Sequence, residues 1–105
     1  MRKLSEVASV IRSKNAGPFE ITFDIIFSDR TTYERVKQSG SIGSELFSRL
    51  YRVPEEHCDF LCFDSAHAFK CTIPRPIAAG DIGDSDVYGT QQHAPLLTVE
   101  VLLDE

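Results

Sequence analysis

The residues of this chain that could do chemistry gather in one stretch, DSDVYGTQQHAPLL at positions 84 to 97. The stretch has no hydrophobic period and places acidic, aromatic, amide and imidazole side chains just before an apolar segment. His93 is the candidate catalytic residue, because an imidazole titrates near neutral pH and can act as a general base. The alternative is a hydrogen-bonded loop residue before Ala94 and Pro95.

Arg75 is the first candidate ligand-binding residue, since it lies between two prolines in the segment TIPRP, residues 72 to 76. The prolines restrict the backbone, so the guanidinium group has less conformational freedom to lose on binding. Its planar fork matches the oxygens of a carboxylate or a phosphate. A surface arginine paired with Asp81 or Asp84 is the alternative.

Amide and aromatic side chains complete the candidate site in this stretch. Gln91 and Gln92 can donate and accept hydrogen bonds, as a ligand site or an oligomer contact requires. Tyr88, before Gly89, is typical of a turn with an aromatic anchor, for which we favour packing over catalysis. Three aspartates resemble half of a calcium loop, but the full pattern is absent, so no metal site and no cofactor are predicted; they are Asp81, Asp84 and Asp86.

The stretch belongs to a connection, residues 74 to 95, that is long for a compact domain. Most connections between elements have about 4 to 6 residues, and longer ones are commonly functional or disordered. Packable side chains such as Ile77, Ile82 and Val87 argue against full disorder. We expect the connection to bind a ligand or a partner, with a structural cover for a sheet edge as the alternative.

Size and charge limit the classes of function. The 105 residues predict a single domain, 1–105, with ordinary contents of 42% hydrophobic and 26% charged residues. A net charge of −5 argues against nucleic-acid binding, and no apolar run is long enough for a membrane span. The three cysteines form no CxxC pair, which favours a reducing cytoplasm, and Cys62 and Cys71 are expected in the core.

The first elements that must position the site are a helix and a strand. Apolar residues at 4, 7, 8 and 11 predict an amphipathic helix of about three turns that ends near KNAGP, residues 14 to 18. The segment FEITFDIIF, residues 19 to 27, alternates strictly and is the clearest strand. Glu20 and Asp24 share its polar face and could pair with Lys70 of a neighbouring strand.

Helices are predicted over 30–38, capped by Ser28 or Asp29 and ended by Gly40, and over 43–51. Strands are predicted over 59–63, 68–73 and 96–103. We therefore predict an α+β fold: a ferredoxin-like α/β sandwich with a single four-stranded, mainly antiparallel sheet, helices on one face and a long loop before the last strand. An irregular α+β roll is the alternative.

Several segments together resemble a small family of domains of unknown function that accompany AtuA-like proteins, named after acyclic terpene utilisation. These segments are VIRSKNAGPFEITFDIIF (10–27), YERVKQSG (33–40), TIPRP (72–76) and DSDVYGTQQHAPLL (84–97). The resemblance implies a ferredoxin-like fold, a larger AtuA-like protein as partner, and a role in catabolism of organic acids or acyl-CoA compounds. The positions that match include the candidate site residues Lys14, Asn15, Arg75, Tyr88, Gln91, Gln92 and His93.

The sequence thus predicts an accessory subunit of an AtuA-like protein, non-catalytic or dependent on its partner. The loop and the corner SKNAGP, residues 13 to 18, would contact the larger chain or complete its ligand site. The corner and QQHAP, residues 91 to 95, enter strands that are neighbours in a ferredoxin-like sheet. One alternative is a small lyase or hydratase for a carboxylate, with His93 as base and Arg75 or Lys14 as anion anchor. The other is a homo-oligomeric structural domain that pairs through the polar sheet face.

Overall fold

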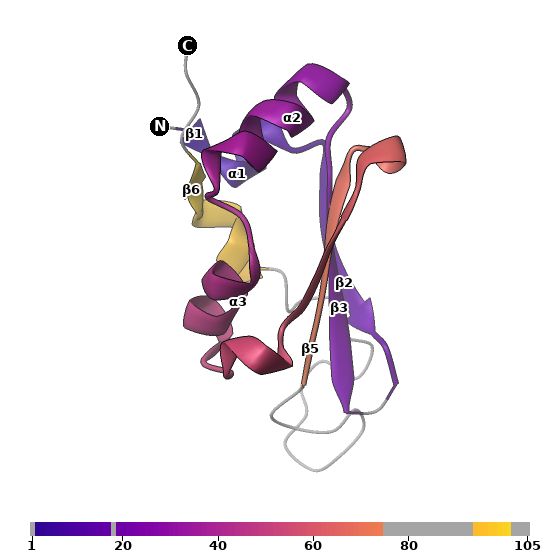
Figure 1. Ribbon diagram of the computed structural model, residues 1–105, viewed down its shortest axis with the longest axis vertical. Helices are drawn as coiled ribbons and strands as arrows, with labels where there is room; N and C mark the ends of the chain where they lie inside the picture. The colour runs from indigo at the N-terminus through magenta and orange to yellow at the C-terminus, as the bar shows by residue number, and fades with distance from the viewer. Residues whose placement is uncertain (1, 18, 75–93, 102–105) are drawn as a thin grey trace.

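The computed structural model describes residues 2–17, 19–74 and 94–101. These residues form an α+β fold with three α-helices and two antiparallel sheets (Figure 1). The helices are α1 (Leu4–Val7), α2 (Arg30–Ser39) and α3 (Ser44–Tyr51), with the 3-10 turns η1 (Glu55–His57), η2 (Asp64–Ala66) and η3 (Ala94–Thr98). The strands are β1 (Arg2–Lys3), β2 (Val10–Asn15), β3 (Glu20–Ile26), β4 (Asp59–Phe63), β5 (Ala68–Pro74) and β6 (Glu100–Val101).

The larger sheet has four strands in the order β2-β3-β5-β4, and every neighbouring pair is antiparallel. β3 pairs along its length with β5 on one side, and with β2 on the other. Asp24 in β3 consequently lies opposite Arg12 of β2 and opposite Lys70 of β5. This register places one acidic side chain between two basic ones on the same face of the sheet.

The prediction of a three-turn helix at the start of the chain is wrong over most of its length. Only Leu4–Val7 is helical, and residues 10 to 15 form β2, which makes a hairpin with β3. The apolar positions fit a helical period, but the charged residues Arg12 and Lys14 also alternate with the uncharged Ser13 and Asn15, which is compatible with a strand. The turn of the hairpin includes Gly17 with φ 105°, a backbone conformation that glycine adopts without strain. Pairing with β3 therefore overrides the local helical pattern.

The last predicted strand is also corrected. Residues 94 to 98 form η3, and the strand β6 pairs with β1 in a separate two-stranded sheet. Leu96 and Val101 are fully buried, whereas Leu97 is 37% exposed, so the apolar run packs as a 3-10 turn followed by a short strand. Strand periodicity cannot separate these cases, since four apolar residues in a short window fit both.

The ferredoxin-like assignment and the single sheet are not confirmed. β3 and β4, which α2 and α3 connect, are both antiparallel to β5 between them, so they run parallel to each other as in a split βαβ unit. The other neighbour of β3, however, is β2 and not the predicted last strand, and β6 pairs with β1 in a second sheet. The two predicted strands 19–27 and 96–103 fall in different sheets, so they are not neighbours. The long connection at 75–93 lies outside the described residues.

The middle of the chain follows the prediction closely. The predicted strands at 19–27, 59–63 and 68–73 correspond to β3, β4 and β5, and the two predicted helices to α2 and α3. The side chain of Asp29 accepts the backbone N–H of Thr32 at 2.9 Å, and Gly40 ends α2 with φ 71°. Both ends of α2 are thus set by local residues whose chemistry is visible in the sequence.

The helices cover one face of the four-stranded sheet, and the core lies between these layers (Figure 1). Aromatic rings join the layers: the Phe23 and Phe47 ring centroids are 5.3 Å apart, and those of Tyr33 and Phe69 are 5.0 Å apart. None of the described helices lies on the opposite face, which we call the outer face. In the described part of the chain, no helix is long and apolar enough to cross a membrane.

Candidate functional site

Asp24 is the centre of the outer face. The residue is only 5% exposed although it points away from the aromatic core. Its carboxylate accepts a hydrogen bond from Arg12 Nε at 3.0 Å, and Lys70 Nζ lies 3.8 Å from its other oxygen. A buried carboxylate is costly without such partners, so the cations that the register supplies are needed at this position. The predicted pairing of Asp24 with Lys70 is confirmed.

A cavity of about 230 Å³ opens beside this charged cluster. Two cationic groups and one carboxylate meet there, which leaves a local excess of positive charge in a chain whose net charge is −5. The rest of the lining is apolar, and a small organic anion would find both a charged wall and an apolar wall. The lining residues are Arg12, Asp24, Ile26, Phe63, Ala66, Ala68 and Lys70.

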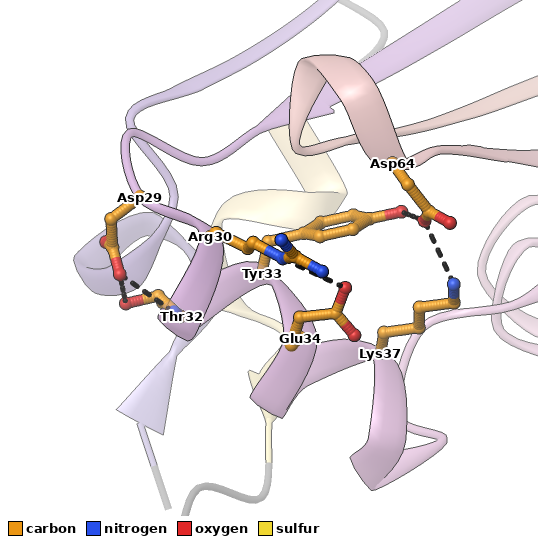
Figure 2. Close-up of polar contacts among 7 residues, drawn as sticks. All are labelled: Asp29, Arg30, Thr32, Tyr33, Glu34, Lys37 and Asp64. Carbon is orange, nitrogen blue, oxygen red and sulfur yellow. Dashed lines mark hydrogen bonds and ion pairs between the residues drawn. The ribbon is translucent and has the colours of Figure 1, made fainter.

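The turn η2, which forms one side of this cavity, is held by helix α2 (Figure 2). Tyr33 Oη of α2 donates a hydrogen bond to Asp64 Oδ1 at 2.5 Å, and Lys37 Nζ lies 2.9 Å from the same oxygen. Asp64 directly follows Phe63, and Ala66 ends the turn. The contact therefore fixes the β4–β5 hairpin against the helical layer and positions two of the residues that line the cavity.

The electrostatics of this contact follow from burial and hydrogen bonding. Burial, reinforced by the Asp64 carboxylate, raises the pKa of Tyr33, which keeps its hydroxyl protonated as a donor. The hydrogen bonds from Tyr33 and Lys37 lower the pKa of Asp64 below its ordinary value of 3.8. The bond to Asp64 raises the pKa of Lys37 in turn. At neutral pH the Tyr33 hydroxyl is therefore protonated, Asp64 is ionised and Lys37 is charged, as the hydrogen bonds between them require.

Of the site residues predicted from the sequence, the structure describes Lys14 and Asn15. Lys14 is exposed near the end of β2, opposite Thr22, and Asn15 is half-buried opposite Ile21. Pro74 ends β5 beside Glu20, at the same end of the sheet as Asn15. The remaining predicted residues lie outside the described residues, so their grouping with Lys14 stays a prediction; they are Arg75, Tyr88, Gln91, Gln92 and His93.

Arg12 is the site residue that sequence reasoning missed. It was assigned to a helix, where its neighbours would be Ala8 and Ala16 rather than Asp24. The available signal was the alternation in VIRSKN, residues 10 to 15, which places Arg12 and Lys14 on one face of a strand. Lys70 was assigned to the correct strand and face, because its segment alternates without a competing helical period.

A second cavity, of about 560 Å³, lies between the α2–α3 connection, α3 and the segment that contains β6. Its charged lining residues are Glu45, Arg49 and Glu100, so the two signs are mixed. Pro95, from the predicted segment QQHAP, also lines this cavity. Because α3 borders this cavity, Pro95 lies with the helical layer and not with the Asp24 cluster on the outer face.

The two buried cysteines are not candidate nucleophiles, because their thiols stay protonated at neutral pH. Cys58 and Cys71 are buried, and burial raises the pKa of the Cys71 thiol to about 12, so it stays protonated. Cys71 is a core residue, as predicted. Cys62 was expected in the core but is exposed, because β4 is the last strand of the described sheet and has no strand beyond it.

The comparisons with known proteins give a family but no activity. Residues 4–100 match DUF4387, a domain of unknown function. The chain belongs to the DUF4387 family. Comparison with curated proteins and with solved structures found no match. The match includes Arg12, Asp24 and Lys70, so the outer-face cluster lies within the family domain.

Replacing Arg12 by Met is expected to lower the free energy of unfolding by about 1 kcal/mol, because the buried Asp24 carboxylate keeps only its longer contact with Lys70. The expected loss is small for a buried carboxylate because the Arg12 side chain is 57% exposed and solvent screens the pair. Denaturant unfolding measures it. Arg30→Met, which breaks the exposed pair with Glu34, is the control with almost no loss; equal losses in both variants would contradict the role of Asp24.

Asp64→Asn is expected to destabilise the protein at neutral pH and to matter less in acid. The folded-state pKa of Asp64 lies below the ordinary 3.8, so its stabilisation is complete above that value and is lost as the pH falls through the folded-state pKa. Urea unfolding of both proteins across the acid range measures this difference. In a Tyr33→Phe background, which lacks the largest cause of the shift, the pH dependence should shrink; a difference that is constant with pH would refute the assignment.

Proposed function

We propose that this DUF4387 chain is a small cytoplasmic accessory subunit that associates with a larger AtuA-like protein in organic-acid or acyl-CoA catabolism. The observation that carries the association is the apolar surface on the outer face. Val10, Leu61 and Phe63 are 40%, 49% and 42% exposed, and none of the described helices covers them. The choice of an AtuA-like partner rests on the sequence resemblance.

The outer face combines the features of a protein-binding surface. Exposed Leu61 and Phe63 lie on β4, and Lys70 Nζ lies 5.5 Å from the centroid of the Phe63 ring. The Asp24 cluster lies next to them, and Thr22 and Thr72 share a hydrogen bond at 3.0 Å further along the same face. Apolar side chains surrounded by ordered polar groups are typical of interfaces that bind a separate chain.

The subunit hypothesis predicts that the tagged full-length chain recovers an AtuA-like protein from its native host. Phe63→Ser is expected to reduce this recovery at least about tenfold, because it removes an exposed aromatic contact. Leu97→Ser is the matched control, since Leu97 is 37% exposed but lies in η3, away from the outer face. Quantitative mass spectrometry measures the recovery. No AtuA-like protein with the unsubstituted chain would contradict the proposal, and equal effects of both substitutions would contradict the surface.

The cavity beside Asp24 favours a second candidate function, the binding of a small carboxylate. The lyase or hydratase activity with His93 as base rests on the sequence alone, because His93 lies outside the described residues. Arg12 contacts Asp24 through Nε, and its side chain is 57% exposed, so its terminal nitrogens can meet a ligand. Lys70 supplies a second cation, and Phe63 and Ile26 supply an apolar wall. Cations and apolar side chains at one cavity suit a short carboxylate better than an uncharged compound.

Butanoate is the probe for this candidate function, and butanol is its uncharged control. Titration followed by NMR chemical shifts should move the amide signals of β2 and β5 with butanoate only. Arg12→Gln and Lys70→Gln should each weaken binding by about tenfold, because each removes a charge-assisted hydrogen bond. Similar shifts with butanol, or undiminished binding in both variants, would remove carboxylate recognition from this cavity.

A further inference from the structure

The two edge strands of the four-stranded sheet differ in how far their side chains prevent pairing with another chain. β2 and β4 are the outermost strands of this sheet within the described residues. An edge strand presents unpaired N–H and C=O groups, which charged side chains or prolines normally protect from pairing with another chain. β2 has Arg12 and Lys14 on its outer face. β4, with the sequence DFLCF, has only Asp59 at its beginning.

The side chains of β4 are apolar on both faces and accessible. Leu61 and Phe63 point to the outer face, where they are 49% and 42% exposed, and Cys62 on the inner side is also exposed. Phe60 is half-buried against the core. A five-residue edge that is apolar on both faces would be covered best by another strand, because strand addition satisfies the backbone and buries both sets of side chains.

The sequence of β4 is complementary to itself in the antiparallel direction. When two copies pair with Leu61 opposite Leu61, all five residues of each strand are matched, and Phe60 lies opposite Cys62. Asp59 of each copy lies opposite Phe63 of the other, so no like charges meet. Lys70 Nζ is 5.5 Å from the Phe63 ring centroid, which brings an ammonium group close to the incoming Asp59. The two-fold axis produces each of these contacts twice.

We propose that two copies of this chain pair antiparallel through β4 around Leu61, forming one continuous eight-stranded sheet with Asp59 of each copy beside Lys70 of the other. The proposal goes beyond the accessory-subunit function and uses a different part of the strand. Pairing engages the backbone edge of β4, whereas the proposed partner contacts side chains on the outer face. The dimer would join the Leu61 and Phe63 surfaces of both copies into one apolar patch.

Charge substitutions at Leu61 test both the interface and its register. Leu61→Glu places two carboxylates opposite each other in the dimer, while in a single chain the new glutamate lies opposite Lys70 and is tolerated. We expect the dissociation constant of the dimer to rise by about 100-fold or more, because like charges face each other across the axis. Sedimentation equilibrium of the full chain measures this, and circular dichroism verifies that the variant is folded.

Mixing Leu61→Glu with Leu61→Lys should restore the dimer as a mixed pair, since opposite charges then meet at the axis. Val10→Glu is the matched control: Val10 is 40% exposed on β2, the other edge, and its substitution should leave the dimer intact.

Three results would overturn the inference. The first is an unsubstituted chain that stays monomeric up to about 100 µM, well above the dissociation constants of stable dimers. The second is a dimer that Leu61→Glu leaves intact or that mixing does not rescue. The third is a dimer that the Val10→Glu control dissociates as strongly as Leu61→Glu does, which would move the interface away from the β4 edge. Recovery of an AtuA-like protein by a monomeric chain would leave the proposed function standing, so the two proposals fail separately.

Discussion

β3 is the strand on which both layers of this fold depend, because its side chains are buried on both faces. Phe23 and Ile25 pack into the aromatic core, and Asp24 between them is buried on the outer face. A shift of one residue in the register would exchange these faces and place a carboxylate among the aromatic rings. The requirement that Asp24 find cations therefore reinforces the hydrophobic choice of register, and it does so on both sides, through Arg12 and through Lys70.

The two faces of the four-stranded sheet consequently have different roles. The inner face supplies the aromatic contacts that bind α2 and α3 to the strands, including Phe23 with Phe47 and Tyr33 with Phe69. The Tyr33 hydroxyl also extends past the aromatic rings and donates a hydrogen bond to Asp64, so this side chain joins the core to the β4–β5 turn (Figure 2). The outer face, without a described helix over it, keeps charged and apolar side chains accessible for binding.

β4 connects the two proposals because it offers two distinct surfaces. Its side chains on the outer face, Leu61 and Phe63, suit a separate protein, while its backbone edge suits another strand. The neighbouring strand β5 contributes Lys70, which contacts Asp24 within the sheet and lies over the Phe63 ring near the edge. Because Lys70 lies between Asp24 and Phe63, the charged cluster and the β4 edge form one continuous surface. A small domain could therefore bind a partner protein and a second copy of itself through adjoining parts of this surface.

The sequence by itself determined the elements in which local chemistry and periodicity agree. The alternation of residues 19 to 27 specified β3 and its faces, and Asp29 and Gly40 specified the ends of α2. The same reasoning placed Asp24 and Lys70 on one face of adjoining strands, which is half of the candidate site. These features need only the period of the strand or the capping of a helix, both of which are properties of neighbouring residues.

Only the tertiary structure decided the segments whose patterns fit more than one element. Residues 10 to 15 became a strand because β3 offered six residue pairs, and this placed Arg12 beside Asp24. The apolar run before β6 became η3, since Leu96 and Val101 are buried in the common core while β6 pairs with β1 and not with the main sheet. A helical period and a strand alternation can coexist in a short run of residues. The free energy that chooses between them comes from distant partners, whose positions a local pattern does not contain.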